Sequence, residues 1–476
     1  MVVQHNMQAA NANRMLNVTT SAQSKSTEKL SSGYRINRAA DDAAGLTISE
    51  KMRKQIRGLD QASTNAQDGV SSVQTAEGAL TEVHSMLQRM NELATQSANG
   101  TNSNTDRKAI QDEIDQLTTE IDRVSETTKF NETYLLKGDG AEKEHNVNAH
   151  DAGLDGVTLT DKGDKVEVTL KELKAGDKIS IAGKNYTIGG TSDDVDTLLK
   201  AANITGADGD KVTINGTEYT YYENAVGGDA LTNKGFYATQ PKAADKASAK
   251  PDYADLDAIK KAKNSTITAG GKSVTTMGNV IDGVDDKDSS VITAKKAYML
   301  ETAEILKASG IGADKAPTAT GNDALDAATN KFSLTKGKVN YNDALSFNLH
   351  VGADADMTNK ITVNIDSMNS AGLGVKGIKA DTEQDATYAI DAIADAISTV
   401  SSQRSALGAV QNRLEHTINN LDNVVENTTT AESRIRDTDM AEEMVNYSKN
   451  NILAQAGQSM LAQANQSNQG VLSLLQ

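Results

Sequence analysis

Proline and glycine, the residues that interrupt helices, are concentrated in the middle of this 476-residue chain. All three prolines lie there, at Pro241, Pro251 and Pro317, and of 36 glycines only six precede residue 138 and three follow residue 383. Proline removes a backbone donor, and glycine costs about 1 kcal/mol in a helix interior. Both chain ends can therefore form long helices, whereas the centre must fold differently.

Apolar residues at both ends recur at steps of three, four or seven, the spacing of a helix face that packs against another helix. Three such seams are present: Met52, Ile56, Leu59, Ala66, Val70, Val73, Leu80, Val83, Leu87 and Met90; then, after a break around Gly100, Ile110, Ile114, Leu117, Ile121 and Val124; and finally Ile390, Ile393, Ile397, Val400, Leu407, Val410, Leu414, Ile418 and Leu421. They predict at least three packed helices. The periodicity alone is typical of any helical bundle or coiled coil.

The centre changes period. Residues 178–188 alternate apolar and polar side chains around a Gly turn, and residues 211–221 repeat this pattern 33 positions later, so each predicts a β-hairpin. A short helix around residues 195–199 suggests that hairpin plus helix is one duplicated unit. We also expect a weaker hairpin at 267–277 and a helix at 291–308.

The expected fold is mainly α: a discontinuous helical rod, a coiled-coil-like bundle made from both chain ends, with a central α+β surface insertion. The predicted segments are 1–44 and 45–137 in the N-terminal half, 138–383 as the insertion, and 384–436 and 437–476 at the C-terminal end. The insertion is one module, or two divided near residues 241–251. The rod helices must meet across it.

Composition and charge exclude several partners. The net charge of -17 opposes nucleic-acid binding, which depends on Lys and Arg displacing counterions. The chain has no run of about 18 apolar residues, the length that a membrane-spanning helix needs, and its N-terminus has no conventional secretory signal. The chain has no Cys. Residues 1–57 carry nine basic and four acidic residues, and residues 437–476 carry one basic and four acidic, so the two ends are electrostatically complementary.

Catalytic and metal-binding constellations are not found. The six histidines are His5, His84, His145, His150, His350 and His416, and none has the His-Glu-x-x-His spacing of a zinc protease. His145 and His150 are interpreted as two solvated histidines, and the aspartates around Asp285 as a solvated turn that misses the calcium-loop spacing. Neither a P-loop nor a Gly-x-Ser-x-Gly elbow occurs. We expect no catalytic residue, cofactor or metal.

Both ends contain long signatures. Residues 30–46, Leu-Ser-Ser-Gly-Tyr-Arg-Ile-Asn-Arg-Ala-Ala-Asp-Asp-Ala-Ala-Gly-Leu, resemble the N-terminal signature of bacterial flagellins, and residues 455–466 with 471–475 resemble the C-terminal one. Residues 405–413 and 433–437 extend the resemblance, which covers the ends and none of the centre. It implies that the following residues serve assembly: Leu30, Arg35, Ile36, Asn37, Asp41, Asp42, Gln455, Leu461, Gln463, Asn465, Leu472 and Leu475.

The flagellin resemblance implies a structural subunit that polymerises into the extracellular flagellar filament. Residues 1–44 and 437–476 would be inner-tube helices, 45–137 and 384–436 the rod, and the centre the outer surface. It also implies type III flagellar export without a cleaved signal peptide, an export chaperone on the C-terminal helix, and contacts with filament cap and hook-filament junction proteins. The alternatives are a hook-filament junction protein and an exported adhesin that uses the centre.

Two rod segments, 88–93 and 110–113, resemble the parts of flagellins bound by the Toll-like flagellin receptor of animal hosts. Arg89, Leu93 and Glu113 match the contact positions. Because Arg89 and Leu93 are four residues apart, they are expected on one helix face, as a guanidinium and an apolar anchor for the same partner surface. The alternative is that these residues serve contacts between subunits of the rod, and both roles can coexist.

Overall fold

The computed structural model describes residues 6–321, 325 and 330–473, with side chains described up to residue 467. The chain divides into two compact units. The first contains residues 1–74, 347–363 and 407–476, and the second contains residues 75–346 and 364–406. The boundaries between the units fall within helices α2 (Ala43–Ser97) and α7 (Glu383–Arg436), so each helix has one part in the first unit and the other part in the second.

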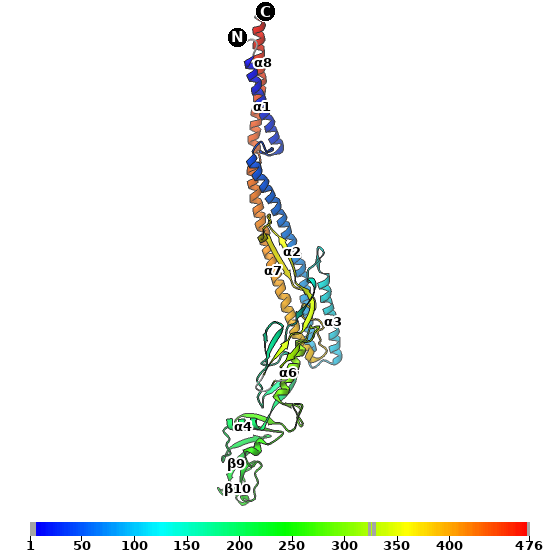
Figure 1. Cartoon of the computed structure of the whole chain (residues 1–476), viewed down its shortest axis with the longest axis vertical. Coiled ribbons are helices and arrows are strands. Elements are labelled where there is room, and N and C mark those ends of the chain that lie inside the picture. Colours follow the sequence, from blue (N-terminus) through cyan, green and yellow to red (C-terminus); the bar gives the residue numbers. More distant parts are fainter. Residues whose placement is uncertain (1–5, 322–324, 326–329, 474–476) are drawn as a thin grey trace. The chain divides into compact units, whose positions relative to one another are not determined.

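In the first unit, α1 (Met7–Ser32) and α8 (Met440–Ser473) lie side by side (Figure 1). The Asn6 side chain caps the start of α1 by accepting a hydrogen bond from the amide of Ala9. Gly33 ends the helix in the left-handed region at φ 78°, where its amide donates to the carbonyl of Lys29. The turn that follows leads into α2.

A two-stranded sheet packs on the helices of the first unit. It consists of β19 (Leu345–His350) and β20 (Lys360–Ile365), joined by the 3₁₀ turn η3 (Met357–Asn359). Ala66 of α2 and Leu414 of α7 share a buried cluster with Ile361. Gly69 allows this close packing, because a Cβ at that position would lie 2.2 Å from Cδ1 of Leu349 and the Leu349 side chain would have to move. The seam residues of both helices therefore bury against each other and against this sheet.

In the second unit, α3 (Asn104–Thr127) begins with a capping box between Ser103 and Asp106. Its buried positions include Ile110, Ile114 and Ile121, as the seam predicts. The seam residues Leu80, Leu87 and Met90 of α2 and Ile393 and Val400 of α7 are fully buried as well. The predicted helices and their packing faces are confirmed.

The remaining elements of the second unit are mostly strands. They are β1 (Lys129–Phe130), β2 (Thr133–Tyr134), β3 (Asp139–Asn146), β4 (Thr158–Asp161), β5 (Lys165–Thr169), β6 (Lys178–Ile181), β7 (Lys184–Gly190), α4 (Ser192–Ala201), β8 (Lys211–Ile214), β9 (Thr217–Asn224), β10 (Ala230–Tyr237), η1 (Ala243–Asp245), α5 (Leu256–Lys260), β11 (Ser265–Ala269), β12 (Lys272–Thr276), β13 (Val280–Ile281), β14 (Val284–Asp285), β15 (Val291–Ile292), α6 (Ala294–Ala308), β16 (Thr318–Thr320), β17 (Lys331–Thr335) and β18 (Lys338–Asp343).

These strands form one large sheet and several small ones. The large sheet has the order β10-β9-β8-β11-β12-β7-β15-β14-β13, with β6 also paired to β7. A second sheet has the order β16-β17-β5-β4, and β18 pairs with β3. One hydrophobic core lies around α6, β6, β7 and the second sheet, and another lies around α4, β8, β11 and β12.

The three predicted hairpins are confirmed as β6–β7, β8–β9 and β11–β12. The helices predicted at 195–199 and 291–308 correspond to α4 and α6. The prediction that hairpin plus helix forms a duplicated unit is wrong, because the second hairpin is followed by strand β10 and not by a helix. Only the hairpin repeats.

Two interpretations of polar residues are also wrong. His150 is buried, and its Nδ1 lies 3.0 Å from a carboxylate oxygen of Asp391, while the His145 ring stacks on Tyr341 at 4.0 Å. Neither histidine is simply solvated. Asp285 is buried too, and its carboxylate accepts hydrogen bonds from the amides of Gly278, Lys287 and Asp288. These backbone donors lower the pKa of Asp285 against the opposing effect of burial.

Candidate assembly and recognition surfaces

The turn after α1 and the turn between α7 and α8 are joined by a cluster that we call the terminal clasp, residues 33–37 and 435–438. The amide of Arg35 donates to the carbonyl of Arg436 at 2.7 Å, and the amide of Thr438 donates to the carbonyl of Gly33 at 2.9 Å. The Arg35 guanidinium also donates to the carbonyl of Ile435 at 2.6 Å. The clasp holds the beginning and the end of the chain together through the backbone.

Charged side chains reinforce the clasp. The guanidinium of Arg436 lies 2.7 Å from a carboxylate oxygen of Glu50 and 4.9 Å from the ring centre of Tyr34. The hydrogen bond from Arg436 lowers the pKa of Glu50. Lys29 of α1 lies 3.7 Å from Glu443 of α8. Part of the charge complementarity between the chain ends is therefore used within one chain.

The N-terminal signature residues are placed around this clasp. Ile36 is fully buried, and Leu30 is half-buried. Asp41 accepts from the amides of Asn37 and Arg38, which lowers the pKa of Asp41. Asp42 accepts from the amide of Gly45 and so caps the start of α2. These carboxylates organise the backbone of the turn.

The C-terminal signature residues lie along α8. The side chains of Gln455, Gln463 and Asn465 are exposed, and that of Leu461 is half-buried. Leu472 lies in α8 beyond the described side chains, and Leu475 lies outside the described residues. A groove of about 800 Å³ runs between α1 and α8, lined by residues that include Leu16, Leu453 and Met460.

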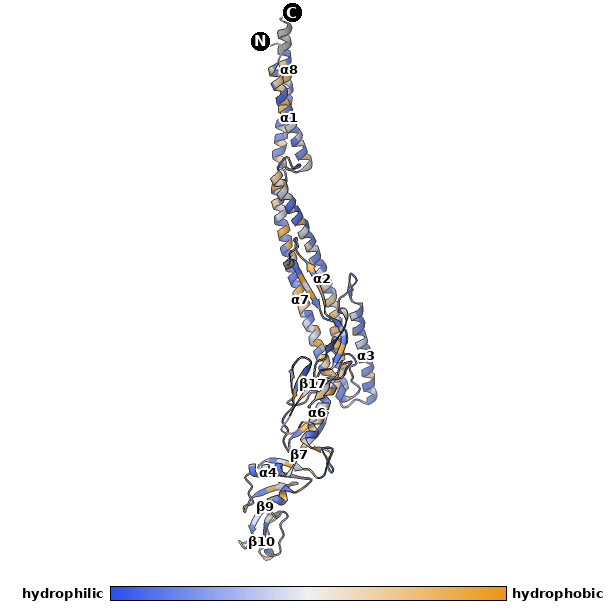
Figure 2. Ribbon diagram, viewed as in Figure 1, coloured by the Kyte–Doolittle hydropathy of each residue, from blue (hydrophilic) through white to orange (hydrophobic). Residues whose placement is uncertain are grey.

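Large apolar side chains remain exposed on both terminal helices. They are Met7, Met15 and Val18 on α1 and Met440, Met444, Val445, Ile452, Leu453 and Met460 on α8. Figure 2 shows such hydrophobic positions in orange along α8. Several exposed apolar side chains on the same pair of helices are typical of a surface that binds a partner.

The predicted recognition residues differ in accessibility. Arg89 is half exposed, and its guanidinium contacts Glu113 of α3 at 2.9 Å and Glu92 at 3.2 Å. These hydrogen bonds, first that to Glu113, raise the pKa of Arg89. Leu93 is only 2 % exposed. The expectation that Leu93 projects outward as an apolar anchor is therefore wrong, because its position three residues after Met90 places it on the buried seam.

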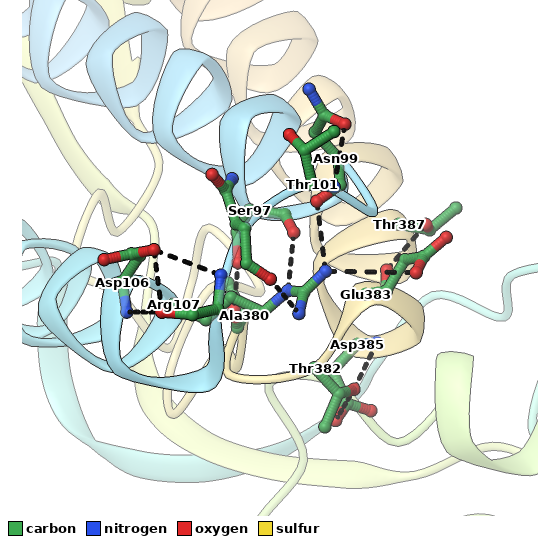
Figure 3. A network of polar contacts seen from close by, with 12 residues as sticks. Ser97, Asn99, Thr101, Asp106, Arg107, Ala380, Thr382, Glu383, Asp385 and Thr387 are labelled. Atoms are coloured by element: carbon green, nitrogen blue, oxygen red, sulfur yellow. Dashed lines mark hydrogen bonds and ion pairs between the residues drawn. The ribbon is translucent and has the colours of Figure 1, made fainter.

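Sequence reasoning missed a buried arginine at the α2–α3 turn (Figure 3). Arg107 donates to the carbonyls of Ser97, Asn102 and Asn99 at 2.9, 2.9 and 3.0 Å and lies 3.9 Å from Glu383. It supplies a donor to the carbonyl of Ser97 at the end of α2, which has no helical partner, and to two carbonyls of the turn that follows. The available signal was a basic residue in the first turn of α3, where the helix dipole disfavours it.

Comparison with known proteins identifies the family. The model of the bacterial flagellin N-terminal helical region matches residues 3–141, and that of the C-terminal helical region matches residues 390–475. A flagellin of Clostridium tyrobutyricum is 41% identical over 474 residues, which covers 98% of this chain and 100% of that protein. The chain belongs to the bacterial flagellin family. Flagellin C of Vibrio cholerae is 35% identical over 473 residues and covers 99% of both chains.

This flagellin is therefore a structural protein, a subunit of the flagellar filament, and not an enzyme. The full-length match does not favour the hook-filament junction protein or the adhesin. A solved structure of FliC from Burkholderia pseudomallei matches over 72% of this chain and 99% of that chain, with 19% identity and a TM-score of 0.26. Among the described residues, no helix is long and apolar enough to cross a membrane, and no three His, Cys, Asp or Glu side chains are grouped to hold a metal ion.

Proposed function

We propose that this flagellin polymerises through the two ends of its chain, with residues 1–44 and 437–476 as inner-tube helices, and that its central module faces outward. The exposed apolar side chains on α1 and α8 support this proposal. Burying apolar surface releases about 25 cal/mol per Å². Copies that cover each other's terminal helices would gain this free energy repeatedly along an open helical polymer.

The central module lacks such a driving force. Residues 138–383 carry 28 basic and 37 acidic residues, so copies packed against each other would bring like charges together. Most large apolar side chains of this segment are buried in its own two cores. An outward position, separated by solvent, suits this segment better than a role in assembly.

Two deletions separate these roles. Replacing residues 148–336 by a flexible linker should leave a chain that polymerises, because the backbone hydrogen bond from Val147 to Gly337 shows that the cut ends are adjacent. This deletion keeps the pair β3–β18 and also the pair β19–β20, which packs on α2 and α7. Removing residues 437–476 should abolish filaments in electron micrographs. Filaments that survive the tail deletion but fail without the centre would refute the proposal.

For delivery, we propose type III flagellar export without a cleaved signal peptide, an export chaperone that binds the C-terminal helix, and contacts with filament cap and hook-filament junction proteins. Membership of the flagellin family supports these partners. The exposed apolar residues of α8 would be covered by the chaperone before assembly. Co-purification of the chain with its chaperone should be lost when residues 437–476 are removed.

For host recognition, we propose that the Toll-like flagellin receptor contacts Arg89 of α2 and Glu113 of α3, while the buried Leu93 supports α2 from beneath. Exposure and the paired charges of these two side chains support a contact role. Arg89→Ala should lower receptor affinity by about tenfold or more, as loss of a central interface arginine does. Arg123→Ala is the matched control, since Arg123 is an exposed rod arginine paired with Glu120. Equal affinities of both variants would point to another surface.

A further inference from the structure

A cavity of about 380 Å³ lies in the second unit beside α6. Its walls come from the loop at residues 152–155, strand β6 and the turn that follows it, α6, and the start of α7. Chemically active side chains in the lining are Lys171, Lys178, Ser180, Glu301, Glu383 and Thr387. The volume is that of a site for a small molecule.

Glu301 of α6 is the most unusual group in this lining. It is only 5 % exposed, and its Oε2 has no hydrogen-bond partner among the residues that the structure describes. Buried polar atoms are nearly always paired, so an unpaired carboxylate oxygen calls for a donor. The other buried acid of α6 differs. Glu304 accepts from the Tyr388 hydroxyl at 2.7 Å and from Lys307 at 2.9 Å.

The turns that line the cavity are strained. Ala182 adopts φ 53° in the two-residue turn of β6–β7, and Ala152 adopts φ 60° in the neighbouring loop. The same position of the other two hairpins holds Asn215 and Gly270, residue types that tolerate the left-handed region. Non-glycine residues held in this region are concentrated at ligand sites. Because position 182 holds Ala where the β8–β9 hairpin holds Asn215, the cavity wall has no side-chain amide at this turn.

The charges of the lining have both signs. Lys171 and Lys178 both line the cavity, and the ammonium of Lys171 lies 2.9 Å from a carboxylate oxygen of the exposed Asp155. Glu301 places a carboxyl group inside. We propose that this cavity binds a free α-amino acid, whose ammonium donates to Oε2 of Glu301 and whose carboxylate is held by Lys171 and Lys178. No residue of the proposed assembly or receptor surfaces takes part.

Binding should depend on pH in a defined direction. Burial raises the pKa of Glu301 to about 7, against the opposing effect of Lys171. The other charged side chains of the lining are Lys178, Glu383 and Asp155, and the hydrogen bond from Lys171 lowers the pKa of Asp155. Only ionised Glu301 attracts the ammonium, so affinity should fall about tenfold from pH 8 to pH 6.

Isothermal titration calorimetry of the full-length monomer with the twenty free L-amino acids at pH 8 tests the proposal. At least one should bind with a stoichiometry of one, Glu301→Gln should weaken it at least tenfold, and Lys178→Met should weaken it too. Glu172→Gln, an exposed acid beside Lys171, is the control and should bind normally. Absence of binding by every amino acid, or equal binding by the Glu301→Gln variant when its circular dichroism is unchanged, would overturn the site. Equal affinity for ethylamine would overturn the role of the carboxylate.

Discussion

Replacing Glu301 with Gln should stabilise the second unit at pH 8 and have little effect at pH 5. Burial raises the pKa of Glu301 from 4.5 to about 7 in the folded chain, whereas the unfolded chain ionises near 4.5. The folded state therefore loses stability as pH rises from 4.5 to about 7, and the loss is complete above that. One pH unit corresponds to about 1.4 kcal/mol, so the full difference is on the order of 3 kcal/mol. Gln cannot ionise and should recover this amount at pH 8.

Urea denaturation without added amino acids, followed by tyrosine fluorescence, measures the effect. Eight of the twelve tyrosines lie in residues 138–383 and the chain has no Trp, so the signal reports mainly on the second unit. Acids whose pKa is lowered in the folded chain, such as Glu144 with a pKa of about 2, stabilise the protein, and this stabilisation is lost as the pH falls below 4.5. Their contribution is the same in the wild type and in Glu301→Gln. A stability difference between wild type and Glu301→Gln that is equal at pH 5 and pH 8 would refute the reasoning. Glu172→Gln should change stability at neither pH.

Three further outcomes are expected. Leu93→Ala should lower the free energy of unfolding by about 2–5 kcal/mol in urea denaturation, because it removes a buried side chain, and an unchanged midpoint would show that Leu93 is not packed. Arg107→Met should speed hydrogen exchange of the amides at residues 97–103 by about tenfold or more and leave α7 beyond its first turn unchanged, since the carbonyls of Ser97, Asn99 and Asn102 each lose a donor. Limited proteolysis of the monomer should trim residues before 44 and after 437 first, because the pair of α1 and α8 buries few side chains, such as Ser26 and Ala454, and is therefore expected to open easily; protection of both ends would contradict this.

Local patterns in the sequence predict those elements that local physics determines. The alternation around Asn215 and Gly216 contains both the strands and the turn residues of a hairpin, and it folds as predicted. Seam spacing likewise placed Leu80 and Leu87 inside. The same spacing places Leu93 on the seam, so periodicity was a better guide to its burial than the resemblance to a contact position.

Burial of polar side chains depends on contacts distant in sequence and was not predicted. His150 is enclosed through Ser309 and Asp391, neither of which lies near it in the chain. Glu301 did leave a signal, since it lies three residues after the buried Tyr298 and four before the buried Ile305 and thus on the apolar face of α6. An acid on such a face is a reason to look for a cavity.

The terminal clasp makes folding of the ends depend on completion of the chain. Its hydrogen bond from Arg35 to Ile435 joins residues 400 positions apart, a loop whose closure cannot begin until both residues are present. Contacts of such long range form late, whereas hairpins and single helix turns form early. A chain delivered one end first therefore holds its leading terminal helix without its partner throughout delivery. The clasp forms only when the second of the two chain ends has been delivered, whichever end is delivered first.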